Sequence, residues 1–485
     1  MVTKNQKVKT RIAPSPTGMV HIGNLRTALY NYLFAQQNKG EFVLRVEDTD
    51  QTRKVEGAIE KVLEMLEWSG LKWDGEITTQ SDRLDIYKKY ADELVKDEKA
   101  YYCFCTPEEL NNMRESQKKH GRLIMYNQNC RNLKQEVVDK NLKDKKPYVI
   151  RLKVPEYEDD KKGKEKEHPV KFKDLVWGNL EFYRYAIDDQ VLIKSDGFPT
   201  YHLAVVVDDH EMNITHIMRG EDWLPSTPKH VLLYQAFGWE MPKFIHLPNI
   251  LGEGKKKLSK RTGDVSVEDF KDKGYLPEAL INYLALLGWN PGTEQEIFSM
   301  KELIKEFDIK KIHKAGAIFD IKKLDNINGQ YIRKLDIKKL VKLCLPYLKD
   351  VKAEKEYIKK VVLIEQDRLK KLSDITENTK LFFTDKLEYD TKLLIWKKSD
   401  TAETKKKLIE TKKKLMEIEA WNKENLEKEV LNFITENSLT NGEVLWPLRV
   451  ALSGQQNSPG PFEIADVLGK EESLKRVESA VKKLN

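Results

Sequence analysis

Residues 11–24 read RIAPSPTGMVHIGN, and this segment constrains the fold more than any other part of the chain. Pro14 and Pro16 fix their own backbone angles and disfavour helix in the residues before them, so the loop they form is stiff. After His21 and Gly23, apolar residues recur every three or four positions, which predicts a helix packed by one face. We therefore predict a short strand, a stiff loop and a helix whose N-terminus faces that loop. Unpaired amides and the helix dipole make such an N-terminus a favourable place for phosphate.

A second motif, LGEGKKKLSKRTGD, occupies residues 251–264. Taken alone, His-x-Gly is most often only a helix cap, and a run of lysines is most often a solvated loop. The two motifs occur in one chain at a domain-length separation, and together they carry far more weight. They indicate a site in which a helix N-terminus and a glycine-flanked cationic loop hold phosphates.

The first segment resembles the HIGH signature of class I aminoacyl-tRNA synthetases, with Asn24 at the place of the final His. The second resembles their KMSKS loop, with Leu258 at the Met place and Arg261 at the final Ser place. Further stretches make the chain similar to bacterial glutamyl-tRNA synthetases of the glutamyl/glutaminyl family, and the resemblance weakens after residue 331. These stretches are FVLRVEDTDQTR at residues 42–53, YHLAVVVDDHEMNITHIMRGEDWLPSTPKH at 201–230 and IHLPNIL at 245–251.

Strand and helix signals alternate through the first hundred residues, which predicts a parallel α/β sheet. The predicted strands lie before Pro14 and at residues 42–46, and the predicted helices lie at 23–38 and 55–68.

Two further strands are predicted later in the chain. The apolar run at residues 203–207 is typical of a strand buried on both faces, with Asp208 and Asp209 at its end. Residues 214–218 predict another strand, which delivers Arg219 to the same edge. Polar groups at the ends of parallel strands point into the crevice where such sheets bind ligands. Asp208 and Asp209 are interpreted as groups that orient basic neighbours.

The resemblance implies an α/β fold: a Rossmann-like catalytic domain with an inserted acceptor-stem-binding domain, followed by all-α anticodon-binding domains. Three cysteines and a charged loop at residues 156–167 set the inserted segment apart in composition. We expect the catalytic domain at residues 1–91 and 202–256, the insertion at 92–201, the KMSKS loop and stem-contact domain at 257–330, and the helical anticodon-binding region at 331–485.

Charged residues make up 34% of the chain, but the net charge is only +7, so any RNA contact must come from local patches. Lysine blocks at residues 405–407 and 412–414 are most often solvated helix faces. No stretch approaches the length of apolar sequence that spans a bilayer, and the start of the chain lacks the apolar core of a signal peptide. Four cysteines cannot form a disulfide framework. We expect a cytoplasmic protein with no membrane segment.

Glutamate carries two carboxylates and one ammonium, so a pocket for it needs cations and at least one anion. The resemblance implies contacts from Arg11, Ser15, Glu47, Tyr201 and Arg219. An arginine grips a carboxylate bidentately, and Arg219 is expected to read the side-chain carboxylate while Glu47 holds the ammonium. The alternatives are a surface charge for Arg11 and a structural ion pair for Arg219.

Adenylate formation needs no covalent nucleophile, because positioning and charge stabilisation carry the rate. The resemblance implies that His21, Gly23, Lys257 and Lys260 are catalytic. The same residues and Ser259 are expected to bind ATP, whose Mg²⁺ arrives with the nucleotide.

Cys103, Cys105 and Cys130 supply three of the four ligands that a zinc site requires. Some relatives complete the set with a His where this chain has Asn132, and certain relatives use a tyrosine four residues before the last cysteine, which here is Tyr126. The alternative is that the thiols are small buried hydrophobes.

The resemblance implies a glutamate–tRNA ligase that charges tRNA(Glu), acts as a monomer and binds no DNA. The helical region would read unstacked anticodon bases with groups such as Arg449 and residues 366–371, whereas Trp446 is better explained as a core aromatic. In the family an arginine there discriminates the third anticodon base, and either Arg368 or Lys371 could align with it. Alternatives are a non-discriminating enzyme that also charges tRNA(Gln), a catalytically silent tRNA-binding protein and a small-metabolite adenylyltransferase.

Overall fold

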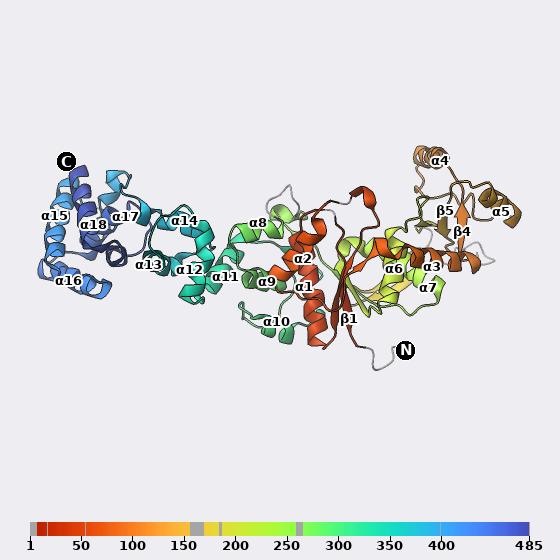
Figure 1. Ribbon diagram of the computed structural model, residues 1–485, viewed down its shortest axis with the longest axis horizontal. Coiled ribbons are helices and arrows are strands. Elements are labelled where there is room, and N and C mark those ends of the chain that lie inside the picture. The colour runs from red at the N-terminus through yellow and green to blue at the C-terminus, as the bar shows by residue number, and fades with distance from the viewer. Residues whose placement is uncertain are drawn as a thin grey trace. The chain divides into compact units, whose positions relative to one another are not determined.

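The computed structural model describes residues 7–16, 18–53, 55–155, 169–183, 187–258, 265–397 and 399–484. The chain divides into two compact units, one made of Met1–Lys271 with Pro277–Ile321 and the other of Asp272–Leu276 with Lys322–Asn485. The first unit mixes helices and strands, whereas the described residues of the second form helices and loops (Figure 1).

The strands of the first unit centre on a mainly parallel sheet. Strands β1, β2 and β3 pair in parallel, as do β9, β10 and β6, and β7 joins β6 in antiparallel fashion. The amide of Thr215 donates to the carbonyl of Lys9 (3.0 Å) where β1 runs beside β9, so the two groups of strands are neighbours. The strands are β1 (Lys9–Ile12), β2 (Glu41–Val46), β3 (Thr78–Thr79), β4 (Ala100–Cys103), β5 (Val149–Leu152), β6 (Val170–Asp174), β7 (Gly178–Phe182), β8 (Val191–Ile193), β9 (His216–Gly220), β10 (Lys243–Leu247), β11 (Ile250–Leu251) and β12 (Ala317–Ile318).

Helix α1 contacts β1, β2 and β9 and buries its apolar face on them, as the three-and-four spacing predicted. The predicted early strands and helices are confirmed as β1, α1, β2 and α2. The helices up to residue 306 are α1 (Ile22–Gln37), α2 (Ala58–Trp68), α3 (Leu84–Lys96), α4 (Pro107–Lys119), α5 (Gln135–Lys143), α6 (Tyr201–Glu211), the 3₁₀-helix η4 (Glu221–Ser226), α7 (Thr227–Phe237), α8 (Val267–Asp272), α9 (Pro277–Leu286) and α10 (Met300–Glu306).

The strand predicted at residues 203–207 is wrong, because this run lies in helix α6. All five of its side chains are buried, and a helix enclosed by neighbours on every side is apolar all round. A short uninterrupted apolar run has the same appearance in a buried helix and a buried strand. Asp208 and Asp209 therefore project from the last turns of a helix rather than from a strand end.

Residues 92–201 contribute to two sheets. Strands β4, β5 and β8 form an antiparallel sheet flanked by α4 and α5 (Figure 1). Strands β6 and β7 instead join the sheet that contains β9 and β10, with Asp174 paired opposite Phe244. The segment predicted to be an insertion is thus connected to the central sheet by backbone pairing, and the charged loop predicted at residues 156–167 lies outside the described residues.

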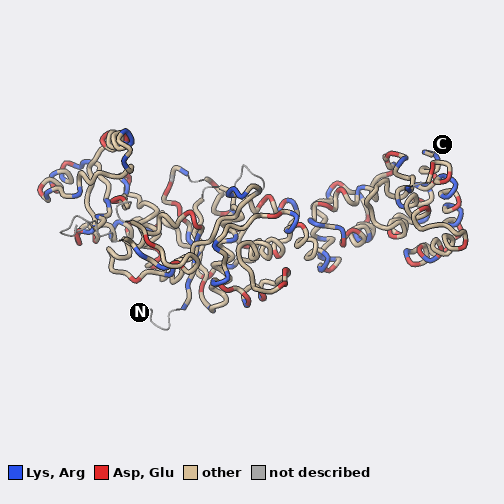
Figure 2. The backbone as a smooth tube through the Cα atoms, turned by 180° about the vertical axis from the view of Figure 1, so that it is seen from behind, with Lys and Arg blue, Asp and Glu red and all other residues tan. Residues whose placement is uncertain are grey.

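The second unit packs its helices around a core that includes Leu408 and Leu415. The two lysine blocks lie on α15, where Lys407, Lys412 and Lys414 pair with glutamates on neighbouring helices. Figure 2 shows cationic and anionic positions interspersed along these helices. No helix among the described residues has the length and apolar character needed to cross a lipid bilayer. The remaining helices are α11 (Ile321–Arg333), α12 (Ile337–Cys344), α13 (Lys355–Glu365), α14 (Asp374–Thr379), α15 (Thr401–Glu417), α16 (Lys423–Glu436), α17 (Asn441–Ser453) and α18 (Pro461–Lys483).

Candidate functional site

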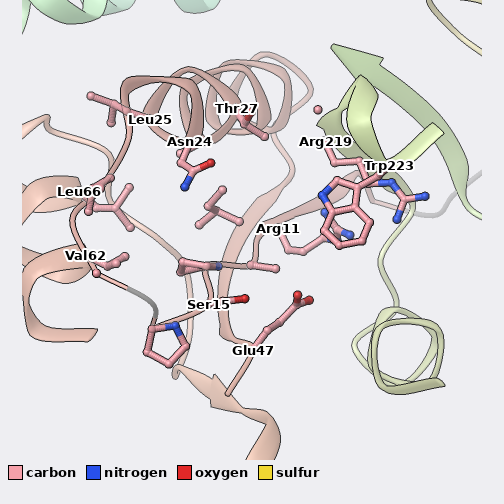
Figure 3. A pocket seen from close by; sticks show the side chains of 18 of the residues that line it. Arg11, Ser15, Asn24, Leu25, Thr27, Glu47, Val62, Leu66, Arg219 and Trp223 are labelled. Atoms are coloured by element: carbon pink, nitrogen blue, oxygen red, sulfur yellow. The ribbon is translucent and has the colours of Figure 1, made fainter. Parts of the chain in front are cut away.

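A cavity of about 430 Å³ opens where β1, β2 and β9 end and α1 begins. It is lined by all five residues predicted to contact glutamate, although they come from four separate segments of the chain: Arg11, Ser15, Glu47, Tyr201 and Arg219. Figure 3 shows Arg11, Glu47 and Arg219 gathered around one space, with Val62 and Leu66 at the other end of the pocket in this view. This is the crevice position expected for ligand sites in parallel sheets.

Arg11 is buried rather than a surface charge. Its Nε donates to Oδ1 of Asp209 at 2.9 Å and its Nη2 donates to Oδ2 at 3.3 Å, so the carboxylate of Asp209 on α6 binds one edge of the guanidinium with two hydrogen bonds. Burial alone would raise the pKa of Asp209, but Arg11 and Arg45 together hold it below its usual value. The prediction that Asp209 orients basic neighbours is confirmed.

Glu47 is positioned by Arg45, a residue that the sequence reasoning did not single out. Arg45 is fully buried, and it donates to Glu47 Oε1 at 3.0 Å and to Asp209 Oδ1 at 2.7 Å. Burial raises the pKa of the Glu47 carboxyl despite this cation. An arginine inside the apolar strand segment FVLRV is a signal that could have identified Arg45, because a buried charge requires partners.

Arg219 has no carboxylate partner within ion-pair distance among the described residues. Its guanidinium donates to neutral acceptors from three elements, which are the Tyr201 hydroxyl (3.3 Å), His230 Nδ1 (3.2 Å), His246 Nε2 (3.1 Å) and Thr227 Oγ1 (2.9 Å). Burial lowers its pKa. The alternative of a structural ion pair therefore finds no support, and the site offers a buried cation whose counter-charge a ligand could supply.

Trp223 forms part of the wall beside Arg219, and the sequence reasoning missed it. Its ring stacks on Tyr201 with centroids 4.3 Å apart, and it stays 40% exposed. Burial raises the pKa of Tyr201, which keeps its hydroxyl neutral. Val205 is buried within α6 and does not line the cavity.

His21 is the N-cap of α1, and its Nδ1 accepts a hydrogen bond from the Gly23 amide at 2.9 Å. An imidazole that accepts through Nδ1 carries its proton on Nε2. The amides of Ile22, Gly23 and Asn24 all have acceptors inside the protein, so the expectation of unpaired amides at this helix start is wrong. A Cβ on residue 23 would lie 3.0 Å from His21 Nδ1, closer than ordinary van der Waals contact, so the ring would have to shift by a few tenths of an ångström.

The chain that follows the second motif lies against the first motif. The Leu258 amide donates to Ile250 (2.9 Å), and after the undescribed residues the chain returns so that Ile22 donates to Val265 (2.8 Å) beside His21. Lys257 is exposed and its Nζ pairs with Asp222 on η4. Ser259 and Lys260 lie outside the described residues. The described residues on either side of the cationic loop are thus bonded to β11 on one side and to the His-x-Gly helix start on the other.

The three cysteines predicted to bind metal lie together, with their Sγ atoms within 4.8 Å of one another. The Tyr126 hydroxyl lies 3.3 Å from Cys103 Sγ and 3.4 Å from Cys105 Sγ. A hydrogen bond with Cys130 is the main cause that lowers the pKa of the Cys103 thiol. Ligands about 2.3 Å from a tetrahedral zinc ion lie at comparable separations, so this donor set fits zinc. Cys103 and Cys130 also pack with Tyr101 in a small apolar cluster, as the alternative requires.

Comparison with known proteins identifies the family of the chain. Residues 7–326 match the family "tRNA synthetases class I (E and Q), catalytic domain", and residues 339–481 match "Anticodon binding domain". A glutamate–tRNA ligase of Clostridium tetani is 46% identical over 489 residues, with 99% of this chain and 98% of the relative covered. One of Clostridioides difficile is 44% identical over 504 residues, with 97% and 98% covered.

A solved structure resembles the whole chain. The crystal structure of a glutamate tRNA ligase from Elizabethkingia meningosepticum in complex with its amino acid superposes with a TM-score of 0.89 at 38% identity, covering 99% of this chain and 100% of that one. Fold, pocket and sequence agree, and the chain belongs to the class I tRNA synthetases for glutamate and glutamine.

Proposed function

We propose that the protein is a glutamate–tRNA ligase, which activates glutamate with ATP as glutamyl-adenylate and transfers it to the 3′ end of tRNA. The observation that carries this proposal is the buried Arg219, which has only neutral partners among the described residues. It shares one cavity with Arg11 and Glu47. Two cations and one anion complement the two carboxylates and the ammonium of glutamate.

Glutamate binds with its side-chain carboxylate on Arg219 and Tyr201 and its ammonium on Glu47. Arg11 and Ser15 lie on the β1 side of the cavity and hold the α-carboxylate of glutamate. Glutamine would bring an uncharged amide to a buried cation. A site that hydrogen-bonds a charged group of its substrate strongly rejects an analogue without that group. Discrimination between the two amino acids then requires no editing site.

ATP binds above the start of α1. His21 donates from Nε2 to a phosphate oxygen, and Gly23 allows the ring to close over the helix end. Lys257 and Lys260 neutralise the phosphates together with the Mg²⁺ that arrives with ATP, and Ser259 donates a hydrogen bond to them. An oxygen of the glutamate α-carboxylate attacks the α-phosphorus of ATP, and pyrophosphate leaves. The terminal ribose hydroxyl of tRNA then attacks the adenylate carbonyl and AMP leaves.

The tRNA partner follows from the match to an anticodon-binding domain. The domain division predicted from the sequence belongs to this proposal, with residues 92–201 meeting the acceptor end of the tRNA and residues 331–485 meeting the anticodon. Arg368, whose Nε pairs with Glu365 at 3.0 Å, and Lys371, whose Nζ lies 3.7 Å from Asp374 Oδ1, are both candidates for reading the third anticodon base. The indole of Trp446 donates to the Leu393 carbonyl (2.8 Å) and packs against the core, which supports its structural interpretation. We also propose a monomeric cytoplasmic enzyme.

Zinc binding by Cys103, Cys105, Cys130 and Tyr126 belongs to the same proposal. Metal analysis of protein purified without chelator should give about one zinc per chain, and Cys130→Ser should abolish it. Cys344→Ser is the matched control, because Cys344 is a buried free thiol of the second unit. A zinc content near zero in the wild-type protein would contradict this part of the proposal.

The proposed function is tested by offering purified tRNA(Glu) and tRNA(Gln) to the protein with ATP and glutamate. Charging of tRNA(Glu) alone indicates a discriminating enzyme, and charging of both indicates a non-discriminating one that serves an amidation pathway. If neither tRNA is charged and pyrophosphate exchange stays absent with tRNA present, the ligase proposal is wrong and a silent tRNA-binding protein takes its place.

A further inference from the structure

We propose that Asp174 and His246 are positioning residues for Arg219: Asp174 fixes the tautomer of His246, and the unprotonated Nε2 of that histidine orients the guanidinium for the carboxylate of the substrate. This inference rests on the proposed role of Arg219 in glutamate binding. Neither residue lines the cavity, so both would act on the ligand only through Arg219.

Asp174 lies at the end of β6 and is almost completely buried, at 1% exposure. Its Oδ2 accepts from the backbone amide of His246 (3.1 Å) and lies 2.7 Å from His246 Nδ1. Its Oδ1 accepts from the amides of Val176 (2.8 Å) and Trp177 (2.9 Å). Four donors converge on this carboxylate, so it is held in one orientation and stays an acceptor.

The contact between Arg219 and His246 determines which histidine nitrogen carries the proton. Arg219 Nε can only donate, and it lies 3.1 Å from His246 Nε2. Nε2 must therefore be unprotonated, and the ring proton sits on Nδ1, where it is donated to Asp174. Burial lowers the pKa of His246 more than Asp174 raises it, so the ring stays neutral. The opposite tautomer would place two N–H groups against each other.

Orientation matters because a guanidinium recognises a carboxylate with a planar pair of N–H groups. His246 holds the Nε edge of Arg219, while Thr227 takes Nη2 at 2.9 Å. Thr227 in turn lies 3.1 Å from the same His246 Nε2, so the histidine contacts both the arginine and one of its other supports. A small rotation of the fork would misalign it with the substrate carboxylate, since catalytic and binding groups tolerate little displacement.

These contacts join separate segments of the chain. Asp174 belongs to the segment predicted to insert into the catalytic domain, and it pairs with β10, the strand that carries His246. The indole of Trp177, from the turn after Asp174, donates to the His246 carbonyl at 3.0 Å. The glutamate-reading arginine is thus supported from residues 174–177 through one histidine side chain.

Two substitutions of His246 separate the two contacts. His246→Asn puts an amide N–H near the place of Nδ1, so it can keep the bond to Asp174 but offers Arg219 no acceptor. His246→Gln reaches the place of Nε2, so its carbonyl can accept from Arg219 while the contact with Asp174 is lost. The proposal predicts a KM for glutamate raised about tenfold or more in H246N. In H246Q the KM should rise by about threefold or less, and the KM for ATP should stay near wild type in both.

Aminoacylation of tRNA(Glu) gives these constants, and thermal unfolding checks that both variants fold. A wild-type KM for glutamate in H246N would overturn the inference, as would equal increases in H246N and H246Q. If H246N does not fold, nitrogen NMR of wild-type protein with labelled histidine decides instead. The signal lost in H246Q should be a neutral ring protonated at Nδ1, and protonation at Nε2 would contradict the proposal. Failure of the wild-type protein to charge glutamate would count against the proposed function itself.

Discussion

Arg11 and Asp209 form a buried, two-bond ion pair across 198 residues of sequence, with Arg11 Nε 2.9 Å from Asp209 Oδ1. Nη1 of Arg45 donates to the same Asp209 oxygen at 2.7 Å, and Nη2 of Arg45 donates to Glu47. One aspartate on a helix therefore sets the positions of a cation and, through Arg45, of an anion that line the cavity. Within this group of four residues the charges sum to zero.

Asp209→Asn should destabilise the protein, because it leaves two buried guanidinium groups without their shared anion. Breaking a buried ion pair by removing one partner typically costs about 3–5 kcal/mol of unfolding free energy. Urea unfolding measures this loss. Asp196→Asn is the matched control, since Asp196 pairs with Lys194 at the surface and such pairs contribute about 1 kcal/mol or less. Equal effects of the two substitutions would contradict the proposed importance of Asp209.

Glu47 should make glutamate binding sensitive to mild acid. The carboxyl must be ionised to hold the ammonium, and burial raises its pKa above that of an ordinary glutamate. As pH falls, Glu47 is therefore protonated earlier than an exposed carboxyl would be, and the KM for glutamate should rise on the acid side. Glu47→Gln should give a high KM that no longer shows this step. A wild-type KM that stays constant down to the ordinary range of carboxyl titration would argue against the assignment.

Gly23→Ala tests the helix start without touching the amino acid pocket. The added Cβ would meet His21 Nδ1 at 3.0 Å, so the ring must tilt away from the helix end. Because a displaced catalytic group costs rate steeply, the maximal rate of adenylate formation should fall by about tenfold to a hundredfold. Pyrophosphate exchange in the presence of tRNA measures this rate, with the KM for glutamate expected to stay near wild type. An unchanged rate would show that His21 acts only as a helix cap.

The parts of this fold that could be predicted are those where local chemistry decides the structure. Two prolines and a three-and-four apolar spacing were enough for the stiff loop and α1. Helix α6 could not be predicted, because its apolar run at residues 203–207 has no periodicity that separates helix from strand. The correction matters for the site, since α6 is the element that carries Asp209.

The residues that line the cavity were predicted more completely than the residues that hold them in position. Each of the five residues predicted to contact glutamate occurs in a motif, and all five line one cavity. The neutral shell around Arg219 comes from Thr227, His230 and His246, which lie on α7 and β10. No spacing rule relates a histidine on one element to an arginine on another, so only the folded chain shows that they meet. Arg45 was within reach of prediction, because a charge in an apolar strand requires buried partners.

The most direct test of the central claim is the catalytic efficiency of aminoacylation with glutamate, measured for the wild-type protein and for Arg219→Leu. If Arg219 supplies the charge that binds the side-chain carboxylate, kcat/KM for glutamate should fall by about a hundredfold, since hydrogen bonds to charged groups contribute about 1.5–3 kcal/mol each. The KM for ATP should change by about twofold or less. An Arg219→Leu variant that folds and keeps the wild-type kcat/KM for glutamate would contradict the account.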